Sequence, residues 1–153
     1  MDTAEIEAAY RDLLTAVEAD TAALAAEARS AVDWTLSHIA LSDRILAAAA
    51  RDVLTGVPPV VDNSSAMDEA AIAALIASTS HRRRIDMVRR NAADLASVIR
   101  TIPNHAAATP VLLRLTNREG RTFPDQHLPW GDLVGLRATE HIPGHTARLA
   151  ALS

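Results

Sequence analysis

Apolar residues recur along most of the chain at the spacing of one helix face. From about Thr3 to Arg29 they fall on a single stripe, which predicts an amphipathic helix with one buried side. A second helical stretch follows, and it ends at Gly56, just before Pro58-Pro59. Ser30 and Asp33 are both suitable N-cap residues, so two starting points for the second helix stay open.

The pattern after Gly56 predicts two more helices and one irregular stretch between them. Asp68 and Glu69 favour the start of a third helix, which continues to about Arg100, before Pro103. The stretch 104–129 is rich in proline, and we expect a short hairpin there, with strands over 111–115 and 121–123. A fourth helix begins near Trp130 and reaches the C-terminus. We therefore expect an all-α fold, a four-helix bundle with a long irregular crossover before the last helix, as one domain over 1–153.

Composition narrows the functional classes. The 153 residues are 49% hydrophobic and 22% charged with a net charge of −4, which gives no general attraction to nucleic acid or to an anionic membrane. No apolar run reaches membrane-spanning length and the first residues are acidic, so we expect a cytoplasmic protein. Cysteine is absent, which excludes disulfides, thiolate metal sites and a cysteine nucleophile. Any thiol chemistry needs a thiol from outside.

Three histidines carry the strongest chemical signal. His38 lies at the centre of the expected core face of the second helix, which Trp34, Leu41, Ile45 and Ala48 share. Asp43 is expected on the other side of that helix, away from the core. His141 and His145 form an H-x-x-x-H on the expected core face of the fourth helix, so both side chains point the same way. Three neutral imidazoles are a ligand set for a catalytic divalent metal such as zinc or nickel. The alternative is three separate core histidines, each hydrogen-bonded to a backbone carbonyl, and we favour the shared metal.

The order of these motifs resembles a known family. TLSHIALSDRIL, then DMVRRNAADLASVIRTI, then LPWGDLVGLRATEHIPGHTARLAAL are similar over nearly the whole chain to the DinB/YfiT-like superfamily of four-helix bundles. That superfamily includes thiol-dependent S-transferases and mycothiol-dependent maleylpyruvate isomerases. The resemblance implies a zinc or nickel site formed by His38, His141 and His145. Pro143-Gly144 departs from a regular helix inside the H-x-x-x-H, and a proline there is expected to push Ile142 away from helical angles.

A second charged motif is 81–90, HRRRIDMVRR. Its five arginines are spread around the helix, so we interpret them as a solvated or salt-bridged surface rather than a nucleic-acid site. His81 is a remote candidate for a fourth ligand, and His105 and His127 are expected to be exposed. The third helix shows apolar residues on two sides, which one core does not easily cover. This predicts a homodimer.

Two hypotheses for function follow. In the first, the histidines hold a divalent metal beside a pocket roofed by residues 104–129, and the protein is a thiol-dependent S-transferase or isomerase. Its partners are a low-molecular-weight thiol and an electrophilic substrate. The arginine- and alanine-rich composition fits a GC-rich genome, and mycothiol is typical of actinobacteria, so mycothiol is the favoured thiol. In the second, the chain is a non-catalytic helical-bundle protein for dimerisation or stress-response interactions, with structural histidines. Metal content separates the two hypotheses.

Overall fold

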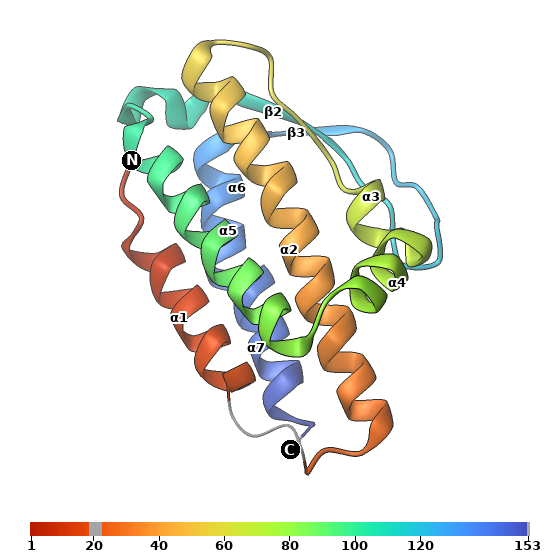
Figure 1. Cartoon of the computed structure of the whole chain (residues 1–153). Coiled ribbons are helices and arrows are strands. Elements are labelled where there is room, and N and C mark those ends of the chain that lie inside the picture. Colours follow the sequence, from red (N-terminus) through yellow and green to blue (C-terminus); the bar gives the residue numbers. More distant parts are fainter. Residues whose placement is uncertain (19–22, 153) are drawn as a thin grey trace.

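Long helices lying side by side dominate the structure, a computed structural model that describes residues 1–18 and 23–152 (Figure 1). They are α1 (Ala4–Glu18), α2 (Ala26–Thr55), α5 (His81–Thr101) and a last stretch without a break, made of α6 (Trp130–Leu136), the π-helical turn η2 (Arg137–His141) and α7 (Ile142–Ala150). The buried apolar side chains of these helices form one core. The protein is therefore mostly helical, as expected from the sequence.

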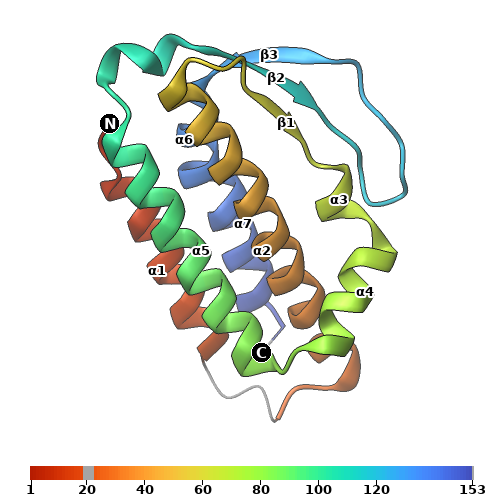
Figure 2. The ribbon, with the colours of Figure 1, turned by 45° about the horizontal axis from the view of Figure 1, so that its top comes forward.

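A small three-stranded sheet lies across one end of these helices (Figure 2), and it makes the all-α prediction incomplete. Its strands are β1 (Val60–Asp62), β2 (Pro110–Arg114) and β3 (Gln126–Pro129), with β1 parallel and β3 antiparallel to β2. The expected hairpin exists, but its second strand begins at Gln126, since Thr116 and Thr122 form only an isolated bridge. The missed strand β1 pairs with a partner 52 positions away (Val60 with Leu112), a distance that local patterns do not encode.

The boundary between the first two helices differs from the prediction. Helix α1 reaches Glu18, α2 already begins at Ala26, and residues 19–22 of the predicted first helix lie outside the described residues. Ser30 and Asp33 are both inside α2 and cap nothing, because the alanine-rich segment before them is itself a strong helix former. The predicted end of the second helix is confirmed: Gly56 adopts the left-handed conformation, with φ of 76°.

The predicted third helix is divided into two, and a short helix precedes it. Short helices α3 (Ser64–Met67) and α4 (Glu69–Ser78) precede α5, and Asp68 caps α4 as expected by accepting from the Ala71 amide at 3.2 Å. The unexpected break falls at Ser80, whose hydroxyl oxygen accepts from the Arg83 amide and caps α5.

The break changes the argument for a homodimer. Most of the apolar residues on both sides of the predicted third helix are buried within the single chain, because α4 and α5 are separate helices; Leu75 and Ile76 are half-buried. The buried residues are Ile72, Ile85, Met87, Val88, Leu95 and Ile99. The observation that motivated a dimer is thus explained without one, and the homodimer itself stays a prediction.

The arginine-rich segment is mostly the salt-bridged surface that the sequence predicts. Arg82 and Arg89 both pair with Asp86, and Arg89 also contacts Glu18. Arg84 is the exception, since it is buried at the α4–α5 break and pairs with Asp33 at 2.7 Å. Among the described residues, no helix combines the length and the apolar character needed to cross a membrane.

Candidate metal centre

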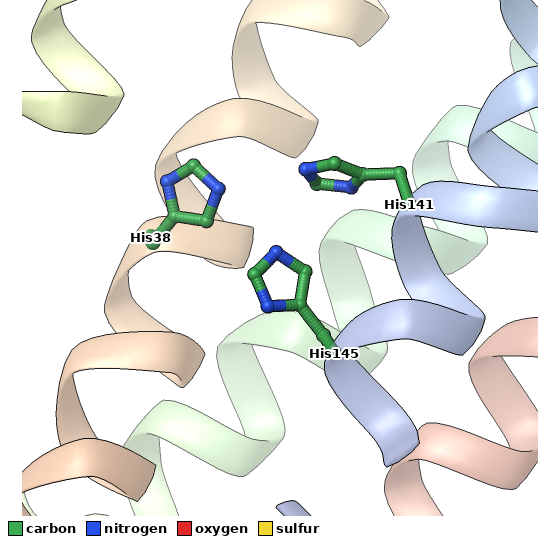
Figure 3. A group of neighbouring side chains, drawn as sticks. All are labelled: His38, His141 and His145. Atoms are coloured by element: carbon green, nitrogen blue, oxygen red, sulfur yellow. The ribbon is translucent and has the colours of Figure 1, made fainter. Parts of the chain in front are cut away.

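The structure brings His38, His141 and His145 together between α2 and the last helical stretch (Figure 3). Ring centroids lie 5.7 Å apart for His38 and His141, 5.3 Å for His38 and His145, and 4.7 Å for His141 and His145. One nitrogen of each ring lies within 4.8 Å of the other two, and these nitrogens point into the space between the rings. The three side chains selected from the sequence thus form one cluster, with His38 and His145 buried.

His38 reaches this cluster from the edge of the α2 core face rather than from its centre. The buried side of α2 includes Leu36, Ile39 and Leu46, whereas Ala48, expected on the core face, is exposed. His38 is buried instead beneath α3, where its Nδ1 lies 2.8 Å from the carbonyl oxygen of Ala66. A carbonyl only accepts, so Nδ1 carries the proton and Nε2 keeps a free lone pair. His38 is therefore prepared to bind a metal through Nε2.

The π-helical turn η2 decides how His141 and His145 are presented. Pro143 lacks the amide hydrogen of a regular helix, and the wider turn immediately before it accommodates this loss. The expected distortion at Ile142 is wrong, because Ile142 is helical with φ of −68° and ψ of −47°. His141 and His145 accordingly remain on one face.

Burial keeps all three imidazoles neutral. Desolvation is the largest cause in each case: it lowers the pKa of His38 and helps to lower the pKa of His141 to about 2 and that of His145 to about 3. The positive charges of Arg137 and Arg148 act in the same direction on each ring. A neutral imidazole has the lone pair that a metal requires, so this donor set suits a divalent cation.

Two arginines complicate the fit. Arg137 lies 2.9 Å from Nδ1 of His141, and Arg148 lies 3.0 Å from Nδ1 of His145. A guanidinium only donates, so each Nδ1 accepts and each neutral ring carries its proton on Nε2. Metal binding through Nε2 needs the opposite tautomer. A tetrahedral zinc site also holds its nitrogens only about 3.3 Å apart, so loading requires the rings to move together and both arginines to turn away.

Arg148 is exposed, whereas Arg137 is held in a buried network. Its guanidinium contacts Asp43 and donates to the hydroxyls of Tyr10 and Ser42 at 3.1 and 2.8 Å. Tyr10 also donates to Asp43. Burial raises the pKa of Asp43, and the charge of Arg137 acts against that rise. Asp43 Oδ2 is buried without a partner among the described residues.

Sequence analysis missed this network. It placed Asp43 on the side of the second helix away from the core, but the residue is 0% exposed. The helical spacing could have predicted the burial of Asp43, because this residue lies in the middle of the stripe formed by Leu36, Ile39 and Leu46.

Two cavities adjoin the histidines. One, of about 420 Å³, lies beneath the sheet, so residues 104–129 contribute to its roof as expected. The other, of about 670 Å³, is lined by Trp34, Arg118 and Arg148 among others. His38 and His141 line both cavities, so a ligand in either one reaches the cluster.

The other histidines lie elsewhere. His81 is at the start of α5, with Nδ1 3.7 Å from Asp33, and it is not part of the cluster. His105 and His127 are exposed, as expected. No protein-family model matches the chain, and neither the curated proteins nor the solved structures contain a significant match. The DinB/YfiT resemblance therefore rests on the sequence motifs alone.

Proposed function

We propose that this protein binds one divalent metal ion, zinc or nickel, through His38, His141 and His145. The observation that carries the proposal is the convergence of three neutral, largely buried imidazoles from two helical stretches. Three nitrogen ligands leave a coordination position open, as in catalytic rather than structural zinc sites.

The DinB/YfiT resemblance adds a finer interpretation. On that basis we interpret the four long helical stretches as a four-helix bundle and the protein as a thiol-dependent S-transferase or isomerase. When bound, the ion would supply Lewis-acid chemistry that lowers the pKa of a thiol or of water. The chain has no cysteine, so the thiol is a separate co-substrate, and mycothiol is our first candidate.

The chain's own residues have distinct parts in this proposal. His38 is fixed in the ligating tautomer by the Ala66 carbonyl, which orients its ring. Arg137, held in the buried Asp43 network, contacts His141 in the metal-free protein and would have to turn away when the ion binds. The two cavities, which share His38 and His141 in their linings, offer places for a thiol and for an electrophilic substrate beside the histidines.

Metal analysis of protein purified without a polyhistidine tag tests the metal site. We expect about one zinc or nickel per chain after reconstitution, and a large loss in a His38→Ala, His141→Ala double variant. A His105→Ala, His127→Ala double variant is the matched control, since both residues are exposed and outside the cluster. Unchanged metal content in the first variant contradicts the proposal.

Turnover of electrophiles in the presence of mycothiol, bacillithiol or glutathione tests catalysis. His38→Ala is expected to abolish turnover while the helical circular dichroism is retained, because it removes a ligand and leaves the helical core. Turnover that is unchanged in His38→Ala contradicts the mechanism.

One observation favours the second candidate, a non-catalytic bundle with structural histidines that acts in dimerisation or stress response. Arg137, Arg148 and the Ala66 carbonyl already give each Nδ1 a partner without any metal. Metal-loaded protein that is inert with every thiol and electrophile, or protein that takes up no metal, supports this candidate.

A further inference from the structure

Aliphatic side chains make up most of the lining of the cavity beneath the sheet. From the sheet side come Val61, Leu113, Leu115 and Leu128; from the helix side come Ile45, Leu46, Leu133 and Leu136. Among the described residues, no phenylalanine, tyrosine or tryptophan lines it. Its volume of about 420 Å³ falls in the range of small-molecule sites.

The strand register produces this lining. Val61 pairs with Leu113 across β1 and β2, and Val111 pairs with Leu128 across β2 and β3, so these side chains share the face toward the helices. On the other side, Ile45 lies one residue before the buried Leu46 of α2, and α6 brings Leu133 and Leu136. Figures 1 and 2 show the sheet lying across the ends of α2 and α6. The cavity is thus built between two layers of the fold.

The polar groups that line the cavity are nearly all engaged. Asn63 donates to the Thr116 carbonyl at 3.1 Å and accepts from the Thr116 amide at 2.7 Å. Ser42 donates to the Ile39 carbonyl and accepts from Arg137. Gln126 is exposed at the rim. Arg137 also lines the cavity, and its guanidinium is engaged by Tyr10, Ser42 and Asp43. The imidazoles of His38 and His141 complete the polar lining, so a ligand finds polar chemistry at Arg137 and the histidines and aliphatic surface elsewhere.

The second cavity presents different chemical groups to a ligand from those of the cavity beneath the sheet. Arg118 stacks over Trp34 at 4.0 Å, and Arg148 lies beside His145, so that cavity presents cationic and aromatic groups. The two arginines favour an anionic group in this cavity, which Met67, Leu149 and Leu152 also line.

We propose that the cavity beneath the sheet binds the saturated aliphatic chain of the substrate and places the substrate's polar reactive end at His38 and His141. This inference rests on the proposed function for the reactive end, since it assigns a substrate class to the same metal centre. The preference for an aliphatic chain rests on the lining alone.

Straight-chain alkyl hydroxamates of two to ten carbons, titrated into zinc-loaded protein by calorimetry, test the inference. The hydroxamate head binds zinc, and each methylene that enters the cavity is expected to increase affinity about fourfold until the cavity is full. Primary alcohols of the same lengths, titrated into metal-free protein, test the cavity without the metal, and the same rise with length is expected.

Leu136→Asp is the diagnostic variant, because Leu136 lines the cavity and is 41% exposed, so the fold tolerates the change. It is expected to weaken octanohydroxamate at least about tenfold and to leave acetohydroxamate unchanged. Leu54→Asp is the matched control, since Leu54 is 43% exposed on α2 and lines neither cavity. It should leave both ligands unchanged.

The two proposals fail in different ways. Stoichiometric zinc with affinity independent of chain length, or benzohydroxamate binding more tightly than octanohydroxamate, overturns the aliphatic assignment and leaves the metal site intact. Failure to bind zinc overturns the proposed function, and the alcohol series then tests the aliphatic assignment by itself. Affinity that rises with chain length, and no longer does so in Leu136→Asp, supports the assignment. Affinity that is independent of chain length overturns it.

Discussion

Arg137 lies 2.9 Å from Nδ1 of His141, and this contact sets the proton on the wrong nitrogen for a metal ligand. The guanidinium has only donors, so Nδ1 accepts and Nε2 is protonated. When a metal binds, Arg137 must lose its contact with His141 and turn toward another acceptor. The nearby Oδ2 of Asp43, which has no partner among the described residues, is a natural acceptor for the released guanidinium.

Replacing this arginine by a residue with an acceptor is expected to strengthen metal binding. In an Arg137→Gln, Asp43→Asn double variant, a glutamine oxygen can accept from Nδ1–H of His141, and no buried charge is left alone. We expect zinc affinity to rise about tenfold, measured by competition with a chromophoric chelator. The matched control is Arg51→Gln, Asp94→Asn, which alters an exposed ion pair of 2.7 Å and should leave the affinity unchanged. Weaker binding in the first variant would show instead that the guanidinium supports the site.

Tyr10→Phe is expected to destabilise the protein by about 1–3 kcal/mol, because it leaves buried hydrogen-bonding groups of Arg137 and Asp43 unpaired. Burial raises the pKa of Tyr10, so its hydroxyl is a donor throughout the neutral range. Urea unfolding measures the loss. Thr55→Val removes an exposed hydroxyl and should change stability by less than about 0.5 kcal/mol. A Tyr10→Phe protein as stable as the wild type contradicts a structural role for the network.

The stability of the metal-free protein is expected to decrease in acid. The folded pKa values of His141 and His145, about 2 and 3, lie below the ordinary value of 6.5, so the unfolded chain binds more protons between about pH 3 and 6.5. Their contribution is complete above pH 6.5 and is lost as the pH falls, by up to about 1.4 kcal/mol per pH unit for each histidine.

Urea unfolding of chelator-treated protein at several pH values measures this dependence. A His141→Gln, His145→Gln variant is expected to show a shallower dependence, and His105→Gln, at an exposed position, should keep the wild-type slope. Equal slopes in all three proteins would contradict buried neutral imidazoles.

Two glycines of α6 are expected to respond oppositely to alanine. A Cβ at Gly131 would lie 3.0 Å from the Cβ and 3.3 Å from the carbonyl oxygen of Ala107, so Gly131→Ala forces η1 (Asn104–Ala108) away from α6. We expect a loss of about 1–3 kcal/mol. A Cβ at Gly135 meets nothing within 4 Å, and Gly135→Ala should stabilise the helix by about 0.5–1 kcal/mol. Thermal unfolding compares the two, and equal effects would contradict close packing at Gly131.

The helix ends that the sequence predicts correctly are those set by local chemistry. Gly56 ends α2 with a left-handed residue, Asp68 caps α4, and Trp130 begins α6 directly after Pro129. The break at Ser80 also has a local cap, but the apolar spacing continues across it and conceals the break. Its cause is tertiary, since the buried Arg84 spans from the Thr79 carbonyl to Asp33 of α2.

The candidate site also contains parts that the sequence predicts and parts that depend on distant contacts. The helical spacing of His141 and His145 and the apolar surroundings of His38 predicted three inward imidazoles, and the structure brings them together. The pairing of Asp43 with Arg137 joins residues 94 positions apart, so no window of sequence contains it. Strand β1 and the aliphatic cavity depend on equally distant contacts.

The π turn makes the histidine cluster tolerant of one change in chain length. A π-helical turn holds one residue more than the α-helical turn that it replaces, and the helix on either side keeps its register. Deleting the exposed Thr139 would therefore restore an ordinary helix through η2 and would leave α7, with His145, facing the same way relative to α6. A search for relatives of this protein should accordingly allow a one-residue gap between Trp130 and His141, because the ligand geometry persists across it.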